Sequence, residues 1–381
     1  MNIFGIDGLY ALILAVPVAA VVGWWIWKNF YESTPLSSVH GANRHEHHEH
    51  EGTGVHICKY DQAEQRRTAH IVNPIDYSNL PPADPKVAAL IATVSVSEIE
   101  TQLRDITGEQ TFTLAGETKQ IVSRNSHAGQ LELAHQYLEA YYAGLGLKTF
   151  RHEYKIRGTK FHNLVVEFPG KVNPRKCFVG GAHLDSTAGN PWRTEKVAPG
   201  ADDDASGTVG IMQLAKLLTK VDNDFTIRLV HFTCEEQGLY GSYAYSDAIE
   251  KENFEKIGMI EMDMIGYCKR EDHRVDIHDD VNKHGAHKLV EILARAAKQY
   301  GLNLSPVDTH NRAVENRSDH AGFQNHKWMA VLVSDPFTDE DFNPNYHTTS
   351  DRVSTLNLPY MAEVIKMVAV ATFQLAGCKV R

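Results

Sequence analysis

Cysteine is scarce in this chain, with five residues among 381, and these are scattered rather than paired in spacing. An odd number of dispersed cysteines in a long chain excludes a small fold built on disulfides. Long clusters of lysine and arginine are also missing, and the net charge is −10, which argues against a nucleic-acid-binding surface. With 43% hydrophobic and 23% charged residues, the composition is that of a globular protein with one large domain or two small ones.

Charged side chains are absent from residues 9–27, a stretch close to the ~20 apolar residues that a membrane-spanning helix needs. No basic residue precedes this stretch, whereas a cleaved signal peptide carries positive charge there. We therefore expect residues 1–28 to form an uncleaved single-pass membrane anchor. Lys28 and Arg44 follow the stretch, so the positive-inside rule alone would keep the rest of the chain in the cytoplasm.

Residues 29–85 are expected to form a stalk between the anchor and a folded region. Prolines near the end of this segment disfavour regular structure. The tract HEHHEH at residues 45–50 is compatible with weak metal binding and with a solvated tail, and the sequence leaves both open. After the stalk we expect an N-terminal helical extension, residues 86–120, packed on a main domain formed by residues 121–381.

Strand-like and helix-like patterns alternate in the main domain. The apolar, β-rich segments are NLVVEF, KCFVGGAH, TIRLVHFT, GMIEMD and KWMAVLVSD. Helical patterns fall near residues 208–220, 240–249 and 285–300, and the last one covers residues 359–376. This alternation predicts an α/β fold with a mixed, largely parallel central sheet covered by helices on both faces.

Three consecutive aspartates precede one of these helices, in the sequence APGADDDASG at residues 198–207. Like charges this close together repel one another, and aspartate is a poor residue for the interior of a helix or strand. The apolar residues Val209, Met212, Ala215 and Leu218 share one face of the helix that follows, which places the triplet beside a core. The arrangement therefore needs a compensating positive charge.

Further carboxylates and histidines follow the other apolar segments, at the strand ends where α/β folds gather their sites. His183 follows CFVGGA, Glu235 and Glu236 follow TIRLVHFTC, Asp263 ends GMIEMD, and His347 lies in the loop FNPNYHTTSD. Each residue alone has an ordinary structural explanation, such as a helix cap or a core histidine. Together, two imidazoles and several carboxylates without cysteine suit zinc or a similar divalent ion. The number of carboxylates favours two ions that share one bridging carboxylate.

The motifs AHLDS, PGADDDASG, CEEQGLYGS, MDM and YHTTSD resemble, in order and context, those of the co-catalytic zinc aminopeptidases typified by bacterial leucyl aminopeptidase. Glutaminyl cyclases, glutamate carboxypeptidase and the transferrin-receptor ectodomain belong to the same wider superfamily. The resemblance covers residues 121–381 and implies the zinc-exopeptidase fold and two Zn²⁺ ions per chain.

The resemblance also implies a role for each residue of the site. The metal ligands would be His183, Asp203, Glu236, Asp263 and His347. Asp203 would bridge the two ions, and a cis peptide bond is expected between it and Asp204. Glu235 would be the general base that takes a proton from the metal-activated water, and Asp185 would orient the imidazole of His183.

For the substrate pocket, the resemblance points to Met264, Phe337, Phe342 and Tyr346. An apolar lining favours leucine, methionine or phenylalanine at the cleaved end, although residues of these types are also commonly part of an ordinary core. Three acidic residues at 339–341 belong to the same loop. They would favour lysine or arginine instead if they face the site.

The resemblance thus predicts an aminopeptidase that acts on peptides with a free N-terminus, and the apolar stretch adds a membrane anchor. Because most relatives work outside the cytoplasm, we expect the catalytic domain there, against the positive-inside rule. Three alternatives stay open. A zinc carboxypeptidase would use Arg312 or Arg317 to hold the substrate's carboxylate, a glutaminyl cyclase would keep a reduced, single-metal site, and a receptor-like ectodomain would be catalytically inactive. The sequence gives no indication of the oligomeric state.

Overall fold

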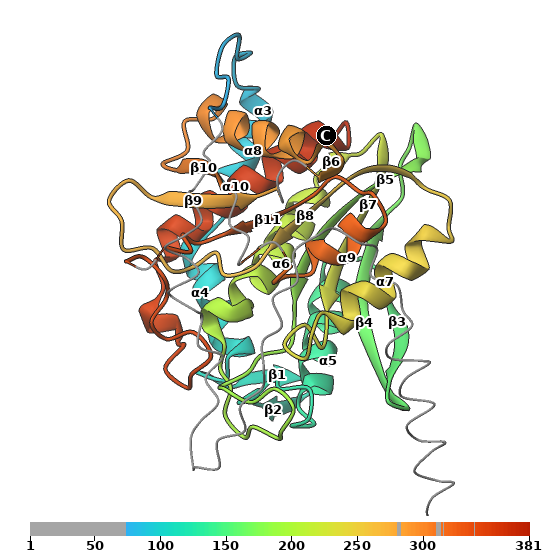
Figure 1. Cartoon of the computed structure of the whole chain (residues 1–381), viewed down its shortest axis with the longest axis vertical. Helices are drawn as coiled ribbons and strands as arrows, with labels where there is room; N and C mark the ends of the chain where they lie inside the picture. Colours follow the sequence, from blue (N-terminus) through green and yellow to red (C-terminus); the bar gives the residue numbers. More distant parts are fainter. Residues whose placement is uncertain (1–73, 280–282, 310–313, 315, 339) are drawn as a thin grey trace, which may run out of the picture. The chain divides into compact units, whose positions relative to one another are not determined.

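The computed structural model describes residues 74–381, apart from residues 280–282, 310–313, 315 and 339 (Figure 1). The expected membrane anchor and most of the expected stalk, including the HEHHEH tract, lie outside the described residues. They therefore remain predictions, as do the boundaries that we assign to the extension and to the main domain.

An eight-stranded mixed sheet forms the centre of the fold, with strand order β10-β9-β11-β8-β5-β7-β4-β3 (Figure 1). Its strands are β3 (Thr149–Ile156), β4 (Thr159–Phe168), β5 (Asn173–His183), β7 (Phe225–Phe232), β8 (Glu255–Met262), β9 (Arg274–His278), β10 (Ser305–Thr309) and β11 (Ala330–Ser334). The central strands β11, β8, β5 and β7 run parallel. On either side the next strand is antiparallel: β9 pairs with β11, and β4 pairs with β7. The expectation of an α/β fold on a mixed central sheet is confirmed.

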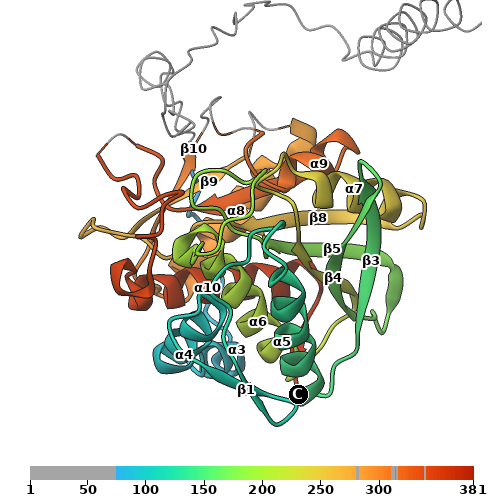
Figure 2. The same ribbon diagram turned by 90° about the horizontal axis from the view of Figure 1, so that it is seen from below.

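Helices on one face of the sheet share a single hydrophobic core (Figure 2). They are α3 (Pro85–Ile91), α4 (Val96–Ile106), α5 (Leu131–Gly144), α6 (Gly207–Leu218), α8 (His287–Gln299) and α10 (Leu358–Leu375). The first residue of α6 is Gly207. A Cβ atom there would lie only 2.0 Å from the carbonyl oxygen of Met262 in β8, so the position requires glycine. The helix therefore starts in direct contact with the sheet, and it is buried on nearly all sides rather than on one face as its apolar pattern indicates.

The opposite face of the sheet is covered by α7 (Tyr240–Glu250) and α9 (His320–Asn325). A second, smaller core lies beneath them, with Tyr245 and Phe323 from the two helices and Val179 from β5. Its neighbours Phe178 and Ala182 in β5 belong to the first core. Both faces of this strand are therefore buried, which explains why its sequence reads as a continuous apolar run.

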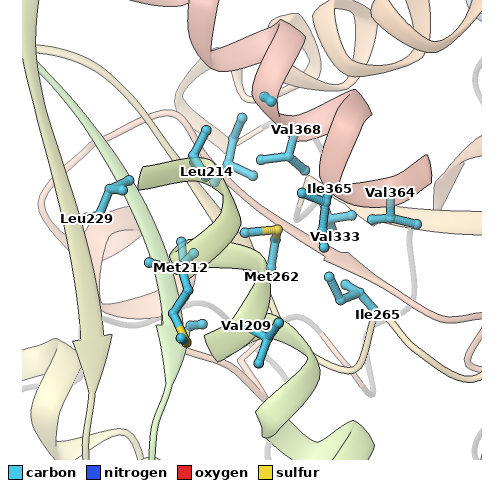
Figure 3. Close-up of a cluster of buried hydrophobic side chains, with 14 of the residues drawn as sticks. Val209, Met212, Leu214, Leu229, Met262, Ile265, Val333, Val364, Ile365 and Val368 are labelled. Atoms are coloured by element: carbon cyan, nitrogen blue, oxygen red, sulfur yellow. The ribbon is translucent and has the colours of Figure 1, made fainter. Parts of the chain in front are cut away.

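The helix α10 is part of the first core (Figure 3). Val364, Ile365 and Val368 of this helix belong to the same cluster of buried side chains as Val209 of α6 and Met262 of β8. Among the described residues, α10 is the one helix long and apolar enough to cross a membrane, but 67% of its apolar window is buried inside the protein. Its hydrophobic character is accounted for by its place in the core.

Short elements complete the described part of the chain. They are the hairpin β1 (Phe112–Leu114) and β2 (Glu117–Lys119), the pair β6 (Val221–Asp222) and β12 (Lys379–Val380), and the 3₁₀ turns Lys283–Gly285 and Val353–Thr355. The sequence patterns do not predict these elements, nor the outer strands β3, β9 and β10. The outer strands carry many polar residues, and β10 contains a proline, so their apolar signal is weak.

Candidate metal centre

The carboxyl ends of three neighbouring strands bring the predicted site residues to one edge of the sheet. His183 is the last residue of β5, Asp263 follows β8 directly, and Glu235 and Glu236 lie in the turn after β7. Because β8, β5 and β7 are parallel neighbours, their carboxyl ends meet at the same edge. His347 joins them from the loop between β11 and α10.

Two groups of ligand atoms meet at this edge, and Asp203 belongs to both. Nε2 of His183 lies 3.0 Å from Oδ1 of Asp203 and 3.6 Å from Oδ1 of Asp263. Nε2 of His347 lies 3.1 Å from Oδ2 of Asp203 and 3.0 Å from Oε2 of Glu236. The structure thus brings together all five predicted ligands, with one carboxylate oxygen of Asp203 facing each histidine.

The third aspartate of the triplet serves the backbone rather than the centre. The carboxylate of Asp204 accepts hydrogen bonds from the backbone N–H groups of His183 at 3.0 Å, Gly207 at 2.8 Å and Met264 at 3.2 Å. Its peptide bond to Asp203 is cis, as predicted. Asp204 therefore fastens the turn before α6 to the ends of β5 and β8.

The first aspartate fastens the same turn on its other side. The carboxylate of Asp202 accepts hydrogen bonds from the N–H of Gly266 at 2.9 Å and from the side-chain amide of Asn343 at 2.7 Å. Asp351, in turn, accepts from the N–H groups of Asp202 at 3.0 and 3.1 Å and of Asp203 at 3.1 Å. Only the middle aspartate is left to face both histidines. Asp351 belongs to the YHTTSD motif, but the sequence alone predicts no role for it.

One buried arginine beneath the cluster has no counterpart among the predicted site residues. Arg124 is fully buried, and burial lowers its pKa to about 10, so it stays positively charged at neutral pH. Its guanidinium donates hydrogen bonds to the carbonyl oxygens of Ile106, Leu184, Pro199 and Gly200. No pattern in the sequence marks this residue, because a single arginine in a polar segment is ordinary. One guanidinium does not balance the many carboxylates above it.

Asp185 holds the backbone of the predicted general base. Its carboxylate accepts hydrogen bonds from the N–H of Glu235 at 3.2 Å and from the hydroxyl of Ser126 at 3.4 Å. Nδ1 of His183 lies 3.9 Å from this carboxylate but 3.1 Å from the backbone carbonyl oxygen of Asp185. In this structure the imidazole therefore meets the carbonyl group, while the carboxylate positions the turn that carries Glu235.

The backbone around the site adopts conformations that side chains disfavour. Cys234, Met264 and His347 all have a positive φ, between 54° and 58°. Non-glycine residues in this left-handed region cost on the order of 1–3 kcal/mol each and persist where the surrounding structure imposes them. Each of the three is a site residue or the direct neighbour of one.

The electrostatics of the cluster favours positive charge at its centre. Burial disfavours charged imidazoles, yet the surrounding carboxylates raise the pKa of His183 and His347 well above the ordinary value. Burial raises the pKa of Glu236 to about 7 and that of Glu235 well above its usual range. The pKa of Asp203 is lowered despite its burial, because both histidines contact it. The cluster therefore attracts cations.

The donor atoms fit divalent ions. Nε2 of His183 and Oε1 of Glu236 are buried and make no hydrogen bond within the described part of the chain. Such buried polar atoms are costly unless something binds them. Imidazole nitrogens and carboxylate oxygens within 3.0–3.6 Å of one another, without sulfur, are a ligand set that zinc accepts.

A cavity opens directly beside the cluster. Asp203, Glu235 and Asp263 line its polar part. The four predicted pocket residues also line it: Met264, Phe337, Phe342 and Tyr346. Three further residues that were not predicted for the pocket wall complete the lining: Val314, Leu332 and Arg317. The rings of Phe337, Phe342 and Tyr346 are neighbours at 5.2–5.3 Å, and Tyr346 stacks on His347 at 3.7 Å.

The acidic residues of the pocket loop do not line this cavity where the structure describes them. Asp341 pairs with Arg270 at 3.1 Å and accepts a hydrogen bond from Thr338 at 2.9 Å. Glu340 is exposed, and residue 339 lies outside the described residues. The acidic residues of this loop that the structure describes therefore give no reason to expect a preference for lysine or arginine.

Comparison with known proteins shows that this chain is similar to peptidases. Peptidase family M28 matches residues 163–372, which is more than half of the chain. Leucine aminopeptidase 1 of Metarhizium robertsii is 32% identical over 215 residues, covering 54% of this chain and 52% of the relative. A probable zinc metalloprotease of Phaeosphaeria nodorum is 29% identical over 212 residues, covering 50% of this chain and 42% of the relative. The chain thus matches about half the length of these relatives.

A solved structure with the same architecture is the LapA aminopeptidase of Legionella pneumophila. It aligns with a TM-score of 0.62 over 81% of this chain and 78% of LapA, at 20% sequence identity. At this level of identity the similarity shows a shared fold.

Proposed function

Because the chain belongs to peptidase family M28, we propose that it is a di-zinc aminopeptidase that removes the N-terminal residue from peptides. The observation that carries this proposal is the double use of Asp203, whose two carboxylate oxygens each face one histidine, while each histidine also faces one further carboxylate. This arrangement supports two neighbouring ions rather than one. The names of the relatives, leucine aminopeptidase and zinc metalloprotease, agree with it.

When bound, two zinc ions would lower the pKa of water and polarise the scissile carbonyl group. Their ligands would be His183, Asp203, Glu236, Asp263 and His347. Glu235 lines the cavity beside them and would take the proton of the attacking water and deliver it to the leaving amine. The hydrogen bond from the N–H of Glu235 to Asp185 would hold this residue in position.

The test uses the full chain supplied with zinc and peptides whose N-terminus is either free or acetylated. We expect cleavage of the free peptides only, with release of single residues from the N-terminus. Two zinc ions per chain should be found by metal analysis. Turnover that ignores N-terminal acetylation would contradict the aminopeptidase proposal, and one ion per chain would favour the glutaminyl cyclase alternative.

The cavity also indicates which N-terminal residues are preferred. Its wall carries aromatic and aliphatic side chains, including Met264, Leu332 and Phe342. We expect leucine, methionine and phenylalanine to be released faster than lysine, since the apolar wall and Arg317 offer a positively charged side chain no partner. A preference for lysine would contradict this assignment of the pocket.

Carboxypeptidase action is the second candidate, because Arg317 lines the same cavity and carries a positive charge that suits a substrate's carboxylate. Arg312, the other candidate, lies outside the described residues. Release of C-terminal residues from acetylated peptides, lost in an Arg317→Ala variant, would support this alternative. The receptor-like alternative predicts no turnover at all, although none of the predicted ligands is missing.

Membrane attachment rests on the sequence alone. We propose that residues 9–27 anchor the chain and that the catalytic domain lies outside the cytoplasm. Extraction of membranes with alkaline carbonate should leave the full chain in the membrane fraction. In intact cells, an external protease should reach the domain; protection of the domain would place it on the cytoplasmic side instead.

A further inference from the structure

A rigid loop follows β5 and lies beside the candidate centre. The carboxylate of Glu195 organises it by accepting four hydrogen bonds. The donors are the hydroxyl of Thr187 at 2.7 Å, the backbone N–H groups of Ala188 at 2.9 Å and Asn190 at 2.8 Å, and the side-chain amide of Asn125 at 3.0 Å. A loop with this internal bonding presents its outer side chains in fixed positions.

An aromatic surface lies at the outer end of this loop. Trp192 is 44% exposed, and its ring meets that of Tyr240 edge-on, with centroids 6.1 Å apart. The ring of His127 lies 6.3 Å from Trp192, and the guanidinium of Arg157 lies 5.1 Å from it. We call Trp192, Tyr240 and His127 the Trp192 platform. An exposed indole held in place by its neighbours is typical of a binding surface.

The platform is tied to the backbone that carries the catalytic groups. The side-chain amide of Gln237, in the turn that follows Glu235, donates a hydrogen bond to the carbonyl oxygen of Pro191 at 2.7 Å. On the other flank, Ser126 precedes His127 and donates to Asp185. The platform is therefore continuous with the candidate centre.

The order of the strands sets the direction from the cavity to the platform. The cavity residues Met264 and Phe337 follow β8 and β11, whereas Trp192 and Tyr240 follow β5 and β7. In the sheet the order is β11, β8, β5, β7, so the loops that carry the platform follow strands next to those that precede Met264 and Phe337 (Figure 1). The platform strands are therefore one to three strand spacings from the cavity strands, about 5–14 Å or one to four extended residues, which includes the second and third positions of a peptide.

We propose that the Trp192 platform binds apolar side chains of the peptide downstream of the scissile bond. This inference rests on the proposed aminopeptidase function. A peptide whose first residue occupies the cavity would extend past Glu235 toward β5 and β7, where Trp192 and Tyr240 offer aromatic faces. The platform would thus favour substrates with phenylalanine or leucine at the second or third position over substrates with glycine there.

The experiment compares four substrates of the zinc-loaded full chain: leucinamide, Leu-Gly-Gly-amide, Leu-Phe-Gly-amide and Leu-Gly-Phe-amide. In a Trp192→Ala variant, KM should rise roughly three- to tenfold for a phenylalanine-containing peptide, as expected from the loss of one aromatic contact. Leucinamide has no downstream side chain, so its kcat/KM should stay unchanged. Trp192→Phe should restore most of the lost preference. Val172→Ala, a change at a 70% exposed residue in the turn before β5, is the matched control and should alter nothing.

The outcomes separate this inference from the proposed function. An equal loss for leucinamide and all peptides would show that Trp192 only supports the loop, and no change for any substrate would show that it contacts none. Both results overturn the inference. If the wild-type chain cleaves no substrate, the proposed function fails, and calorimetric binding of Leu-Gly-Phe-amide then decides about the platform. Binding that Trp192→Ala does not weaken, or no binding at all, overturns the inference as well.

Discussion

Two regions of the molecule gather buried histidines, and the pKa values of these histidines move in opposite directions. At the strand edge, carboxylates raise the pKa of His183 and His347 well above the ordinary value, against the effect of burial. The second region, which we call the region beneath α5, lies where this helix packs on the sheet. There, burial lowers the pKa of His135 in α5 to about 4 and that of His231 in β7 to about 3. The residue type is the same, so the neighbouring groups decide in which direction the pKa of a buried imidazole moves.

The region beneath α5 also contains a group with the composition of a metal site, namely Glu132, His135 and His162. A cation already meets it, because Arg151 contacts Glu132 at 2.8 Å and Nε2 of His162 at 2.9 Å. Both ring nitrogens of His135 lie within hydrogen-bonding distance of backbone carbonyl oxygens. At the strand edge, by contrast, Nε2 of His183 lies 3.0 and 3.6 Å from carboxylate oxygens of Asp203 and Asp263 rather than beside backbone carbonyl groups. Composition alone therefore does not identify a metal centre.

The largest expected effect comes from removing the shared carboxylate. An Asp203→Ala variant should fall from two zinc ions per chain toward none and should lose turnover, because both ligand groups depend on this residue. Metal analysis after dialysis and a peptidase assay measure the two effects. His135→Ala is the matched control beneath α5 and should leave the zinc content unchanged. Loss of zinc in this control would make the two regions equivalent.

Next in size is the effect of Glu235→Gln on turnover. We expect kcat to fall by roughly 10²- to 10⁴-fold, the usual contribution of a general base. Zinc content should remain at two ions per chain, since Glu235 is not among the proposed ligands. Turnover within tenfold of the wild type would exclude Glu235 as the base.

A smaller effect concerns stability in acid and tests the region beneath α5. Nε2 of His231 shares a hydrogen bond of 2.6 Å with the hydroxyl of Tyr142, and the ring is buried in its neutral form. Its pKa is about 3 in the folded chain and ~6.5 in the unfolded chain, so its contribution is complete above pH 6.5 and is lost as the pH falls toward 3. By pH 4 the loss should reach about 3 kcal/mol of unfolding free energy.

Denaturant unfolding at pH 7 and pH 4 checks this expectation in the wild type and in His231→Gln. The variant keeps a hydrogen-bond acceptor for Tyr142 but cannot be protonated in this range, so its stability should fall less between the two pH values. Equal losses in both proteins would show that His231 does not determine the acid sensitivity.

The smallest effect is expected from Arg151→Met. Its ion pairs with Glu132 and Glu139 are partly exposed, so their loss should lower the unfolding free energy by only about 1 kcal/mol. Zinc content should stay at two ions per chain, because His135 remains hydrogen-bonded to the backbone. Binding of a third ion would mean that only the guanidinium of Arg151 prevents Glu132, His135 and His162 from binding a metal ion.

The elements of this protein that could be predicted are those with a strong local pattern of apolar residues. The five apolar segments read from the sequence became β4, β5, β7, β8 and β11, since continuous apolar runs mark buried strands. The outer strands escaped prediction because their alternation is interrupted by charged residues and Pro306. The ordered motifs, through the resemblance, indicated the five proposed ligands, whose donor atoms meet at one edge of the sheet.

The residues that support the site were harder to foresee. Arg124 acts through carbonyl oxygens far along the chain, and Asp351 acts through the backbone N–H groups of Asp202 and Asp203. Such contacts join segments whose separation in sequence carries no pattern. The Trp192 platform was missed for a related reason: a lone exposed tryptophan gains meaning only from the neighbours that fix it.

Arg124 also limits how the protein can be divided. The segment matched by family M28 begins at residue 163, yet this arginine, well before it, holds the carbonyl groups of Leu184, Pro199 and Gly200. A fragment cut at the family boundary would keep every proposed ligand and lose the buried cation beneath them. The catalytic unit is therefore larger than its recognisable signature, and transplanting the signature alone into another protein would leave its carboxylates without their internal counter-charge.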